Sequence, residues 1–412
     1  MTKADKEGQR KTPILRFKGF TDDWEQRKLK ELIKEPLSYG LNASSKEYDG
    51  IHKYLRITDI DEENRKFNDN KLTSPDIKFN ALSKRYLLDN NDLVFARTGA
   101  STGKVYMYKK TDGEVYYAGF LIKASLTSDF NVNFIFQQTY QKKYYHYVKI
   151  ISQRSGQPGI NSKEYGNFKF SITQIQEQNK IGKLFKLLDT LLTLYERKLK
   201  LLSQVKKYFL DNLFAEKEYP NLRFKGYEDT WLKNKFSRFL SIPKKEKVTV
   251  DSPSRILTVK LNLGGVQKGA NRTTLKLNST TYYLRKAGQL IYGKQNLFNG
   301  SLAIIPSQFE GYVTSGDVPS LNIDNINKQF LYYYIARKSF YKKTEAYSSG
   351  TGSKRIHEKT FLSFNIVYPE NLKEQEKISR LISSINSNIK LYCSKKNKLT
   401  AIKKKLLNTM FI

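Results

Sequence analysis

The chain has 412 residues, and its 73 Lys and Arg against 39 Asp and Glu give a formal net charge of +34. A charge this large favours polyanionic partners, namely nucleic acid, an anionic membrane surface or an acidic protein. The length suffices for two or three domains, and 39% hydrophobic with 13% aromatic residues excludes a disordered basic chain.

Cysteine and histidine are too scarce for several common kinds of site. Cys393 is the single cysteine, which excludes an internal disulfide and fits a reducing compartment. The three histidines, His52, His146 and His357, argue against a structural zinc site. No apolar run approaches the roughly 20 residues that cross a bilayer, and residues 1–13 show no signal-peptide pattern. We therefore expect a cytoplasmic protein.

Two short stretches of the sequence occur twice, about half a chain length apart. Residues 15–24 read LRFKGFTDDW and residues 222–231 read LRFKGYEDTW, with seven of ten positions identical. The pentapeptide EQNKI at 177–181 returns as EQEKI at 374–378. A period of about 200 residues is far longer than that of a solenoid, so the pattern indicates a duplicated domain followed by a duplicated tail.

The two domains are predicted to cover residues 14–172 and 217–369, after a polar tail at 1–13. Strand-like runs such as YLRITDI, DLVFAR, KVYMYKK and QLIYGK are separated by clusters of Asn, Asp and Gly. FIFQQTYQKKYYHYV in the first domain and QFLYYYIARKSFYK in the second each have the pattern of one helix. We therefore predict the α+β class, with two mixed α/β domains that each contain a curved sheet.

Each domain is followed by a segment, 173–216 or 370–412, with the pattern of one long helix. Apolar residues recur at every seventh position, which is the spacing of a coiled-coil seam, and the two stripes are most simply buried against each other. Lys206, Lys396 and Lys403 interrupt the second seam position. The seam residues, which are also the candidate partner interface, are Ile181, Leu188, Tyr195, Leu202, Phe209, Ile378, Ile385, Tyr392, Leu399 and Leu406.

The motifs of catalysis and cofactor binding are missing from the sequence. GASTGK at 99–104 has three residues between its glycines and Val105 after its lysine, whereas a Walker loop needs four and then Ser or Thr. No GxGxxG follows a strand, and paired prolines, which the substrate loop of amino-methyltransferases requires, are absent. We interpret GASTGK as a turn between strands and expect a binding protein with no catalytic, cofactor or metal site.

Basic and amide side chains gather in glycine-rich turns at two matched places in each domain. One pair of turns follows the strands DLVFA and QLIY, and the other lies at 152–161 and 348–357. Loops on a rigid frame can be aimed at DNA, where Arg suits guanine, Asn and Gln suit adenine, and Lys meets phosphate. The candidate DNA-binding residues are Arg97, Lys104, Arg154, Gln157, Asn161, Lys294, Gln295, Asn296, Lys354 and Arg355.

The order of these parts resembles the specificity subunit of type I restriction-modification enzymes. The LRFKGF…W segment, the DLVFARTG…GK turn and the EQ-x-K-I helix start carry the resemblance, which covers nearly the whole chain after residue 13. It implies two target-recognition domains that each read one half of a bipartite DNA site. It also implies two helices that pair antiparallel as a spacer in a pseudo-two-fold tandem repeat.

The same resemblance implies partners that carry out the chemistry. Two methyltransferase subunits would dock on the helices and bring S-adenosylmethionine, and restriction (motor-nuclease) subunits would bring ATP and Mg²⁺. The chain itself would hold no cofactor and no catalytic residue, in agreement with the missing motifs.

Three other functions remain open at this point. A stand-alone basic DNA- or RNA-binding protein would lack methyltransferase partners. A nuclease, or an NTPase built on GASTGK, would hydrolyse its substrate without them. A dimerising structural coiled coil leaves the two domains and their charge unexplained.

Overall fold

Two units of structure are present, and each long helix contributes to both. The computed structural model describes residues 11–62, 64–154, 156–269, 280–350 and 353–412. The first unit combines Met1–Glu196 with Ser394–Ile412, and the second unit is Arg197–Cys393. Most of the polar tail predicted at 1–13 lies outside the described residues.

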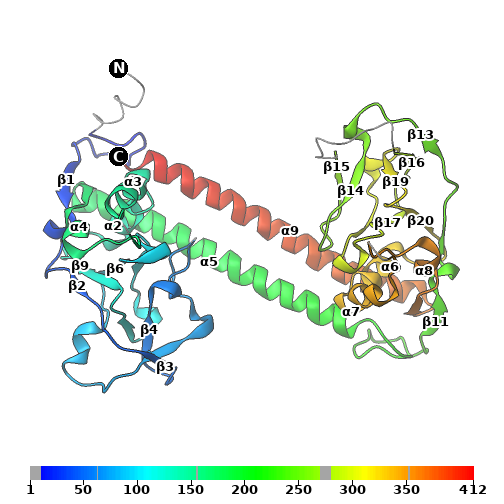
Figure 1. Ribbon diagram of the computed structural model, residues 1–412, viewed down its shortest axis with the longest axis horizontal. Coiled ribbons are helices and arrows are strands. Elements are labelled where there is room, and N and C mark those ends of the chain that lie inside the picture. Colours follow the sequence, from blue (N-terminus) through cyan, green and yellow to red (C-terminus); the bar gives the residue numbers. More distant parts are fainter. Residues whose placement is uncertain (1–10, 63, 155, 270–279, 351–352) are drawn as a thin grey trace. The chain divides into compact units, whose positions relative to one another are not determined.

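The first unit is built on a four-stranded antiparallel sheet in the order β2-β9-β6-β7 (Figure 1). All residues of its inner strand β6 are buried, which explains the continuous apolar run in DLVFA. Leu93 of β6 lies opposite Ala124 on one side and Met107 on the other. The strands of this sheet are β2 (Ser38–Tyr39), β6 (Asp92–Ala96), β7 (Val105–Met107) and β9 (Leu121–Ser125).

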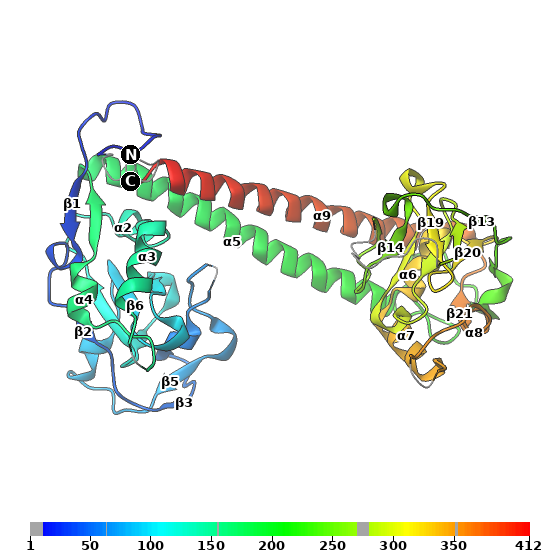
Figure 2. The same ribbon diagram turned by 45° about the horizontal axis from the view of Figure 1, so that its top comes forward.

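Three two-stranded pairs complete the strands of the first unit (Figure 2). They are antiparallel β1 (Glu25–Lys28) with β10 (Lys169–Ile172), antiparallel β3 (Ser45–Glu47) with β5 (Thr73–Pro75), and parallel β4 (Lys53–Leu55) with β8 (Val115–Tyr117). The β1–β10 pair joins the segment after the LRFKGF repeat to the strand before the long helix, so both ends of the domain meet.

The second unit repeats this plan. Its four-stranded antiparallel sheet has the order β12-β20-β17-β18, and β11 pairs with β21 as β1 pairs with β10. The strands of these two sheets are β11 (Leu232–Lys235), β12 (Leu240–Ser241), β17 (Leu290–Tyr292), β18 (Leu302–Ile304), β20 (Ser320–Ile323) and β21 (Asn365–Tyr368). The remaining strands are β13 (Lys247–Val248), β14 (Leu257–Val259), β15 (Val266–Lys268), β16 (Tyr282–Leu284) and β19 (Val313–Ser315).

The prediction of a single helix in each domain is wrong, because each of the two segments contains two helices. In the first unit, the Thr139 hydroxyl donates to the Phe136 carbonyl at 2.7 Å and ends α2, and the extended backbone of Gln141 then starts α3. Arg337 has the same extended conformation and separates α6 from α7. The short helices are α2 (Val132–Gln138), α3 (Lys142–Ile151), α4 (Ser162–Asn167), α6 (Lys328–Ile335), α7 (Lys338–Tyr341) and α8 (Glu358–Leu362).

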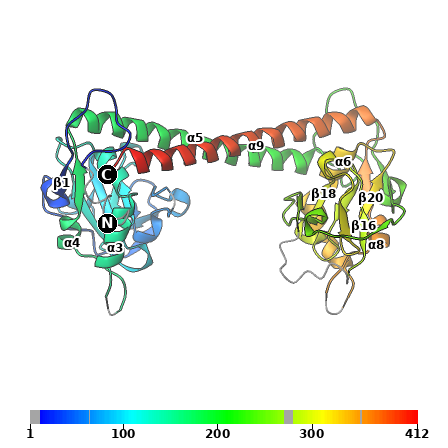
Figure 3. The same cartoon turned by 90° about the horizontal axis from the view of Figure 1, so that it is seen from above.

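The two long helices are present as expected and run antiparallel in each unit (Figure 3). They are α5 (Ile175–Asn212) and α9 (Leu372–Thr409), each of 38 residues. In the first unit Asp189 contacts Lys403 at 2.6 Å and Glu196 contacts Lys396 at 3.2 Å, so one helix ascends as the other descends. Two of the three lysines that interrupt the apolar seam, Lys396 and Lys403, are thus neutralised by carboxylates on the other helix.

In the second unit the same pairing continues with different contacts. The Lys198 ammonium lies 4.2 Å from the centre of the Tyr392 ring. Burial, and then the charge of Lys390, lower the pKa of Lys206 at the third interrupted position. All seam residues predicted from the heptads are buried or half-buried, which confirms the coiled-coil pattern. Within the described ranges, no helix is long and apolar enough to cross a membrane.

Each unit buries the start of one long helix together with the end of the other. In the first unit Phe185 near the start of α5 packs with Phe411 just after α9, their rings 5.5 Å apart. In the second unit Ile378 and Ile382 of α9 share a core with Phe214, which follows α5. The helices are therefore part of both hydrophobic cores, and not only a link between domains.

A buried carboxylate fixes the first turn of α5. Glu177 is fully buried, and its carboxylate accepts hydrogen bonds from Nε and Nη2 of Arg16 at 2.7 and 2.8 Å. Trp24 Nε1 donates to the same carboxylate at 3.2 Å, and the Thr173 hydroxyl donates at 2.5 Å. The hydrogen bonds to Glu177 raise the pKa of the Arg16 guanidinium. The two repeated motifs thus bind each other, because LRFKGF…W supplies the donors and EQNKI supplies the acceptor.

The second unit makes the same pair, but among the described residues its carboxylate accepts two hydrogen bonds where Glu177 accepts four. Arg223 donates to Glu374 at 2.8 and 2.9 Å, and Glu374 is 1% exposed. The indole nitrogen of Trp231 is buried without a hydrogen-bond partner among the described residues. Removing one partner of such a buried pair costs about 3–5 kcal/mol of stability, because the other charge is left uncompensated.

The glutamine of each EQ motif connects the long helix to the short helices. Gln178 accepts a hydrogen bond at 3.0 Å from the backbone of Asn131, the N-cap residue of α2, and donates at 2.7 Å to the Thr173 carbonyl. Gln375 accepts at 2.8 Å from Asn327, the N-cap residue of α6. The EQ motif is therefore a structural anchor in both units.

The chain has two tryptophans, and their unequal bonding gives a matched test of this anchor. We expect Trp24→Phe to lower the free energy of unfolding by about 1.5–3 kcal/mol more than Trp231→Phe, because only Trp24 donates to a buried carboxylate. Urea denaturation followed by circular dichroism measures both variants. Equal losses would show that the Trp24–Glu177 bond contributes nothing.

Candidate nucleic-acid interface

The two basic turns predicted in the first domain lie against each other. The backbone nitrogen of Ile160 donates to the carbonyl of Arg97, and that of Gly99 donates to Pro158, both at 2.9 Å. Thr98 and Gly159 form an isolated antiparallel bridge between these two hydrogen bonds. Residues 97–104 therefore form one composite loop with the distant residues 152–154 and 156–161, and we call it the first paired loop.

Glycine at position 99 is required by this arrangement. Gly99 has φ +67, which L side chains rarely adopt, and a Cβ atom there would lie 2.9 Å from Nε2 of Gln157. Lys104 closes the turn, since its nitrogen donates to the Ser101 carbonyl and its own carbonyl accepts from Ala96. GASTGK is thus a turn between β6 and β7, as predicted.

The second unit contains the equivalent second paired loop, formed by residues 294–301, 348–350 and 353–357. The nitrogen of Ile356 donates to the Lys294 carbonyl at 2.9 Å, as Ile160 does to Arg97. Ser349 and Arg355 bridge the two arms of the outer segment. The sequence matched each turn to its counterpart in the other domain, and the structure adds that the two turns within one domain lie against each other.

Both paired loops lie at the same end of the four-stranded sheet of their unit. In the first unit this end contains the last residue of β2, Tyr39, and the residue before β9, Phe120, whose carbonyl accepts from Arg97 at 3.0 Å. In the second unit the nitrogen of Lys294 donates to the carbonyl of Asp317 at 2.9 Å. These hydrogen bonds make Phe120 and Asp317 equivalent positions.

The sheet end of the first unit combines an unpaired cation with exposed aromatic rings. The Arg97 guanidinium lies 4.9 Å from the centre of the Tyr39 ring, and no described carboxylate is within ion-pair distance of it. Phe120 is 58% exposed, which is unusual for phenylalanine. Burial raises the pKa of Tyr39, but the hydrogen bonds with Ser162 and the Arg97 charge oppose it, and the net pKa is lowered.

The sheet end of the second unit holds ion pairs instead. Lys294 contacts Glu358 at 3.0 Å, and both side chains are 12% exposed. Burial of Glu358 favours a higher pKa, but Lys294 and Lys245 together lower the pKa of its carboxyl below the ordinary value. Arg355 lies 3.5 Å from the exposed carboxylate of Asp317. Lys294 is therefore less accessible than its position in a glycine-rich turn suggested.

The remaining candidates divide into free and engaged side chains. Arg154 pairs with Glu164 at 2.6 Å, and Lys354 pairs with Glu345 at 3.1 Å. Asn161 is the N-cap of α4, and Asn296 accepts from Asn299. Within the described residues, the candidates whose side chains make neither a hydrogen bond nor an ion pair are Arg97, Lys104, Gln157 and Gln295.

Sequence reasoning missed three residues at these sheet ends, namely Tyr39, Phe120 and Asp317. An aromatic residue at a strand end is ordinarily buried, so only the structure shows that Tyr39 and Phe120 are exposed. The signal for Asp317 was its alignment with Phe120, which changes an apolar side chain to an acidic one between the repeats.

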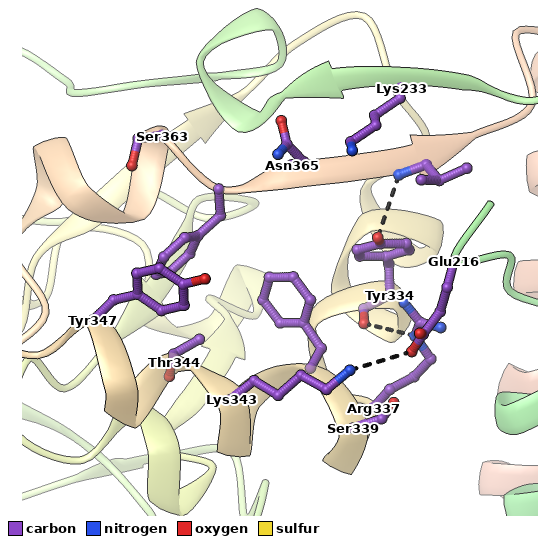
Figure 4. A pocket seen from close by; sticks show the side chains of 13 residues that line it. Glu216, Lys233, Tyr334, Arg337, Ser339, Lys343, Thr344, Tyr347, Ser363 and Asn365 are labelled. Carbon is purple, nitrogen blue, oxygen red and sulfur yellow. Dashed lines mark hydrogen bonds and ion pairs between the residues drawn. The ribbon is translucent and has the colours of Figure 1, made fainter.

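A cavity of about 340 Å³ lies in the second unit (Figure 4). Its wall includes Arg337, which is 4% exposed, donates to the Tyr334 carbonyl at 3.1 Å and stacks 5.3 Å from the Phe214 ring. Burial lowers the pKa of Arg337. Gln141 starts α3 as Arg337 starts α7, and it donates to Leu407 near the end of α9.

These contacts show that the cavity wall belongs to the scaffold that holds the ends of the long helices.

In the part of the chain that the structure describes, no group of three His, Cys, Asp or Glu side chains could hold a metal ion.

Comparisons with known proteins agree with this geometry. The model of the type I restriction modification DNA specificity domain matches residues 21–204 and 241–401. The type I restriction enzyme MjaVIII specificity subunit of Methanocaldococcus jannaschii is 21% identical over 351 residues, which cover 80% of each chain. The crystal structure of the type I restriction-modification S subunit from M. genitalium has the same fold, with a TM-score of 0.67 and 13% identity over 97% of this chain and 99% of that one.

The family model matches well over half of the chain, in two copies that each contain one of the sheets and one paired loop. This chain therefore belongs to the type I restriction-modification DNA specificity family.

Proposed function

We propose that this chain recognises a bipartite DNA site, with residues 14–172 and 217–369 as target-recognition domains that each read one half. The observation that carries the proposal is the pair of equivalent loops on equivalent sheet ends, held by the same backbone hydrogen bonds but lined by different side chains. Two domains with the same backbone frame can each bind one half of the same DNA site. Because their loops carry different side chains, the two half-sites can differ in sequence. The formal charge of +34 supports binding to a polyanion.

As a member of this family the chain is the non-catalytic component that supplies DNA recognition. We propose that two methyltransferase subunits bind it and bring S-adenosylmethionine, that restriction subunits bring ATP and Mg²⁺, and that the assembly works in the cytoplasm. Helix α5 offers a surface for such partners, because an apolar stripe remains exposed on the part of it that belongs to each unit. The exposed residues are Leu187, Leu191 and Leu194 in the first unit and Leu201, Val205 and Tyr208 in the second.

The alternative of a stand-alone DNA- or RNA-binding protein makes no use of this stripe. An NTPase built on GASTGK is not supported, because Gly99 packs against Gln157 and the turn is closed by its own backbone. Purification of the chain together with a methyltransferase separates the proposed function from the stand-alone alternative.

Binding to duplex DNA is expected to depend steeply on salt. The logarithm of the association constant should fall by about 0.9 per phosphate contacted for each tenfold rise in salt. Fluorescence anisotropy with a labelled duplex at several salt concentrations gives this slope. An affinity that does not change between low and moderate salt would contradict a phosphate-binding surface.

Arg97→Ala is expected to relax recognition of one half-site, and Lys294→Ala the other, because the two residues belong to different units. A lost bidentate base contact costs about 1–3 kcal/mol, whereas a lost phosphate contact lowers affinity without changing specificity. Since Lys294→Ala also leaves the half-buried Glu358 carboxylate without its ion-pair partner, the double variant Lys294→Ala, Glu358→Gln is its control. Binding to duplexes altered in one half-site measures the effect, and unchanged discrimination in both variants would refute the loop assignment.

We further propose that the paired helices set the spacer between the half-sites. Four residues inserted near Leu199–Ser203 approximate one helical turn, which keeps the seam in register and adds roughly 6 Å. Since duplex DNA rises about 3.4 Å per base pair, we expect a spacer longer by about one or two base pairs. Three- or five-residue insertions rotate the seam and should weaken assembly.

Methylation mapping of the four-residue insertion variant, compared with the original chain, measures the spacer. Full activity with an unchanged spacer would show that the helices do not set the distance. Altered half-sites would show that the helices contribute to base readout.

A further inference from the structure

Phe120 and Asp317 occupy one position in the two units. Each precedes the strand next to the central hairpin, β9 or β20, and each accepts the backbone hydrogen bond of the basic residue that opens the paired loop. These hydrogen bonds, from Arg97 at 3.0 Å and from Lys294 at 2.9 Å, fix the backbone alike. The two side chains therefore leave the sheet end from equivalent places.

The chemistry of this position is opposite in the two units. Phe120 is 58% exposed, and its backbone is hydrogen-bonded to that of Arg97, whose guanidinium has no ion pair with a described carboxylate. An apolar ring and a guanidinium are therefore both available to a ligand at this sheet end. The Asp317 side chain is 52% exposed, and Arg355 approaches one of its oxygens at 3.5 Å. Within the described residues, the second oxygen of Asp317 has no hydrogen-bond donor.

Neither side chain suits contact with the DNA backbone. Phosphate repels a carboxylate, and a phenyl ring offers it no donor. In the major groove, however, an apolar ring can pack on the C5-methyl group of thymine, and a carboxylate can accept from the N4 amino group of cytosine. Arg97 beside Phe120 has the donors for guanine O6 and N7.

We infer that position 120 in the first unit and position 317 in the second are equivalent base-reading positions, with Phe120 selecting thymine and Asp317 selecting cytosine. This rests on the proposed function, since both contacts require DNA at the sheet ends. The exchange at this one structural position thus contributes to the difference in specificity between the two domains, beside the loop residues that the sequence indicated.

The test is modified-base sequencing of DNA from cells that express the chain with its methyltransferase partner. Phe120→Ala should reduce discrimination at one thymine of the first half-site by about ten- to a hundredfold and leave the second half-site unchanged. Asp317→Ala should do the same at one cytosine of the second half-site only. In each variant the half-site read by the other unit reports that the protein is folded and assembled.

Conservative and matched variants keep the result decisive. Phe120→Leu retains an apolar contact and should keep the preference for thymine, even if Phe120→Ala loses all activity. Leu82→Ala and Asp251→Asn change exposed residues of the same kinds outside the paired loops and should leave both half-sites unchanged.

The outcomes separate the inference from the proposed function. An original chain that directs no methylation to a bipartite site contradicts the proposed function itself. A bipartite site whose half-sites are unaltered by Phe120→Ala and Asp317→Ala, or altered at other bases, overturns the inference alone. Loss of the thymine preference in Phe120→Leu overturns it as well.

Discussion

A buried carboxylate–guanidinium pair at the first turn of each long helix is the contact on which both copies of the fold depend. Glu177 with Arg16, and Glu374 with Arg223, bring the start of each domain to the start of the helix that follows it. Because this pair is buried, removing either partner leaves the other charge uncompensated and destabilises the fold. The adjacent glutamines then fix the short helices, so one EQ dipeptide positions three parts of each unit.

This anchoring explains how similar frames can support different chemistry. The pairs Arg16–Glu177 and Arg223–Glu374 lie at the helix starts, and the paired loops lie at a sheet end that the same frame holds in place. Side chains there can change without disturbing the anchor. The unpaired Arg97 and exposed Phe120 of the first unit, against the ion-paired Lys294 and acidic Asp317 of the second, show the extent of that freedom.

Much of this architecture is readable from the sequence, for reasons that are local. Heptads predict helices directly, and α5 and α9 were found within a few residues of their observed bounds. Strand β6 follows from the buried run DLVFA. Aligning the two halves of the sequence with each other matched the loop around Arg97 to the loop around Lys294, because such an alignment requires only the sequence.

What the sequence could not supply depends on contacts between distant residues. The break between α2 and α3 comes from the extended backbone at Gln141, and the composition of the segment does not show it. The low exposure of the Lys294 side chain accompanies its ion pair with Glu358, which is 64 positions away in the sequence. The function of the repeated motifs was also hidden, because Arg16 and Glu177 are conspicuous only once the fold brings them together.

The central claim is that two equivalent loops, held alike but lined differently, read two different halves of one DNA site. The most direct measurement is base-resolved mapping of methylated DNA in cells that contain this chain and the methyltransferase partner proposed for it, compared with cells that lack the chain. The expected result is methylation within a two-part motif whose unlike halves are separated by a spacer of fixed length and free sequence. A single continuous motif, two identical halves, or methylation that does not depend on the chain would contradict this account.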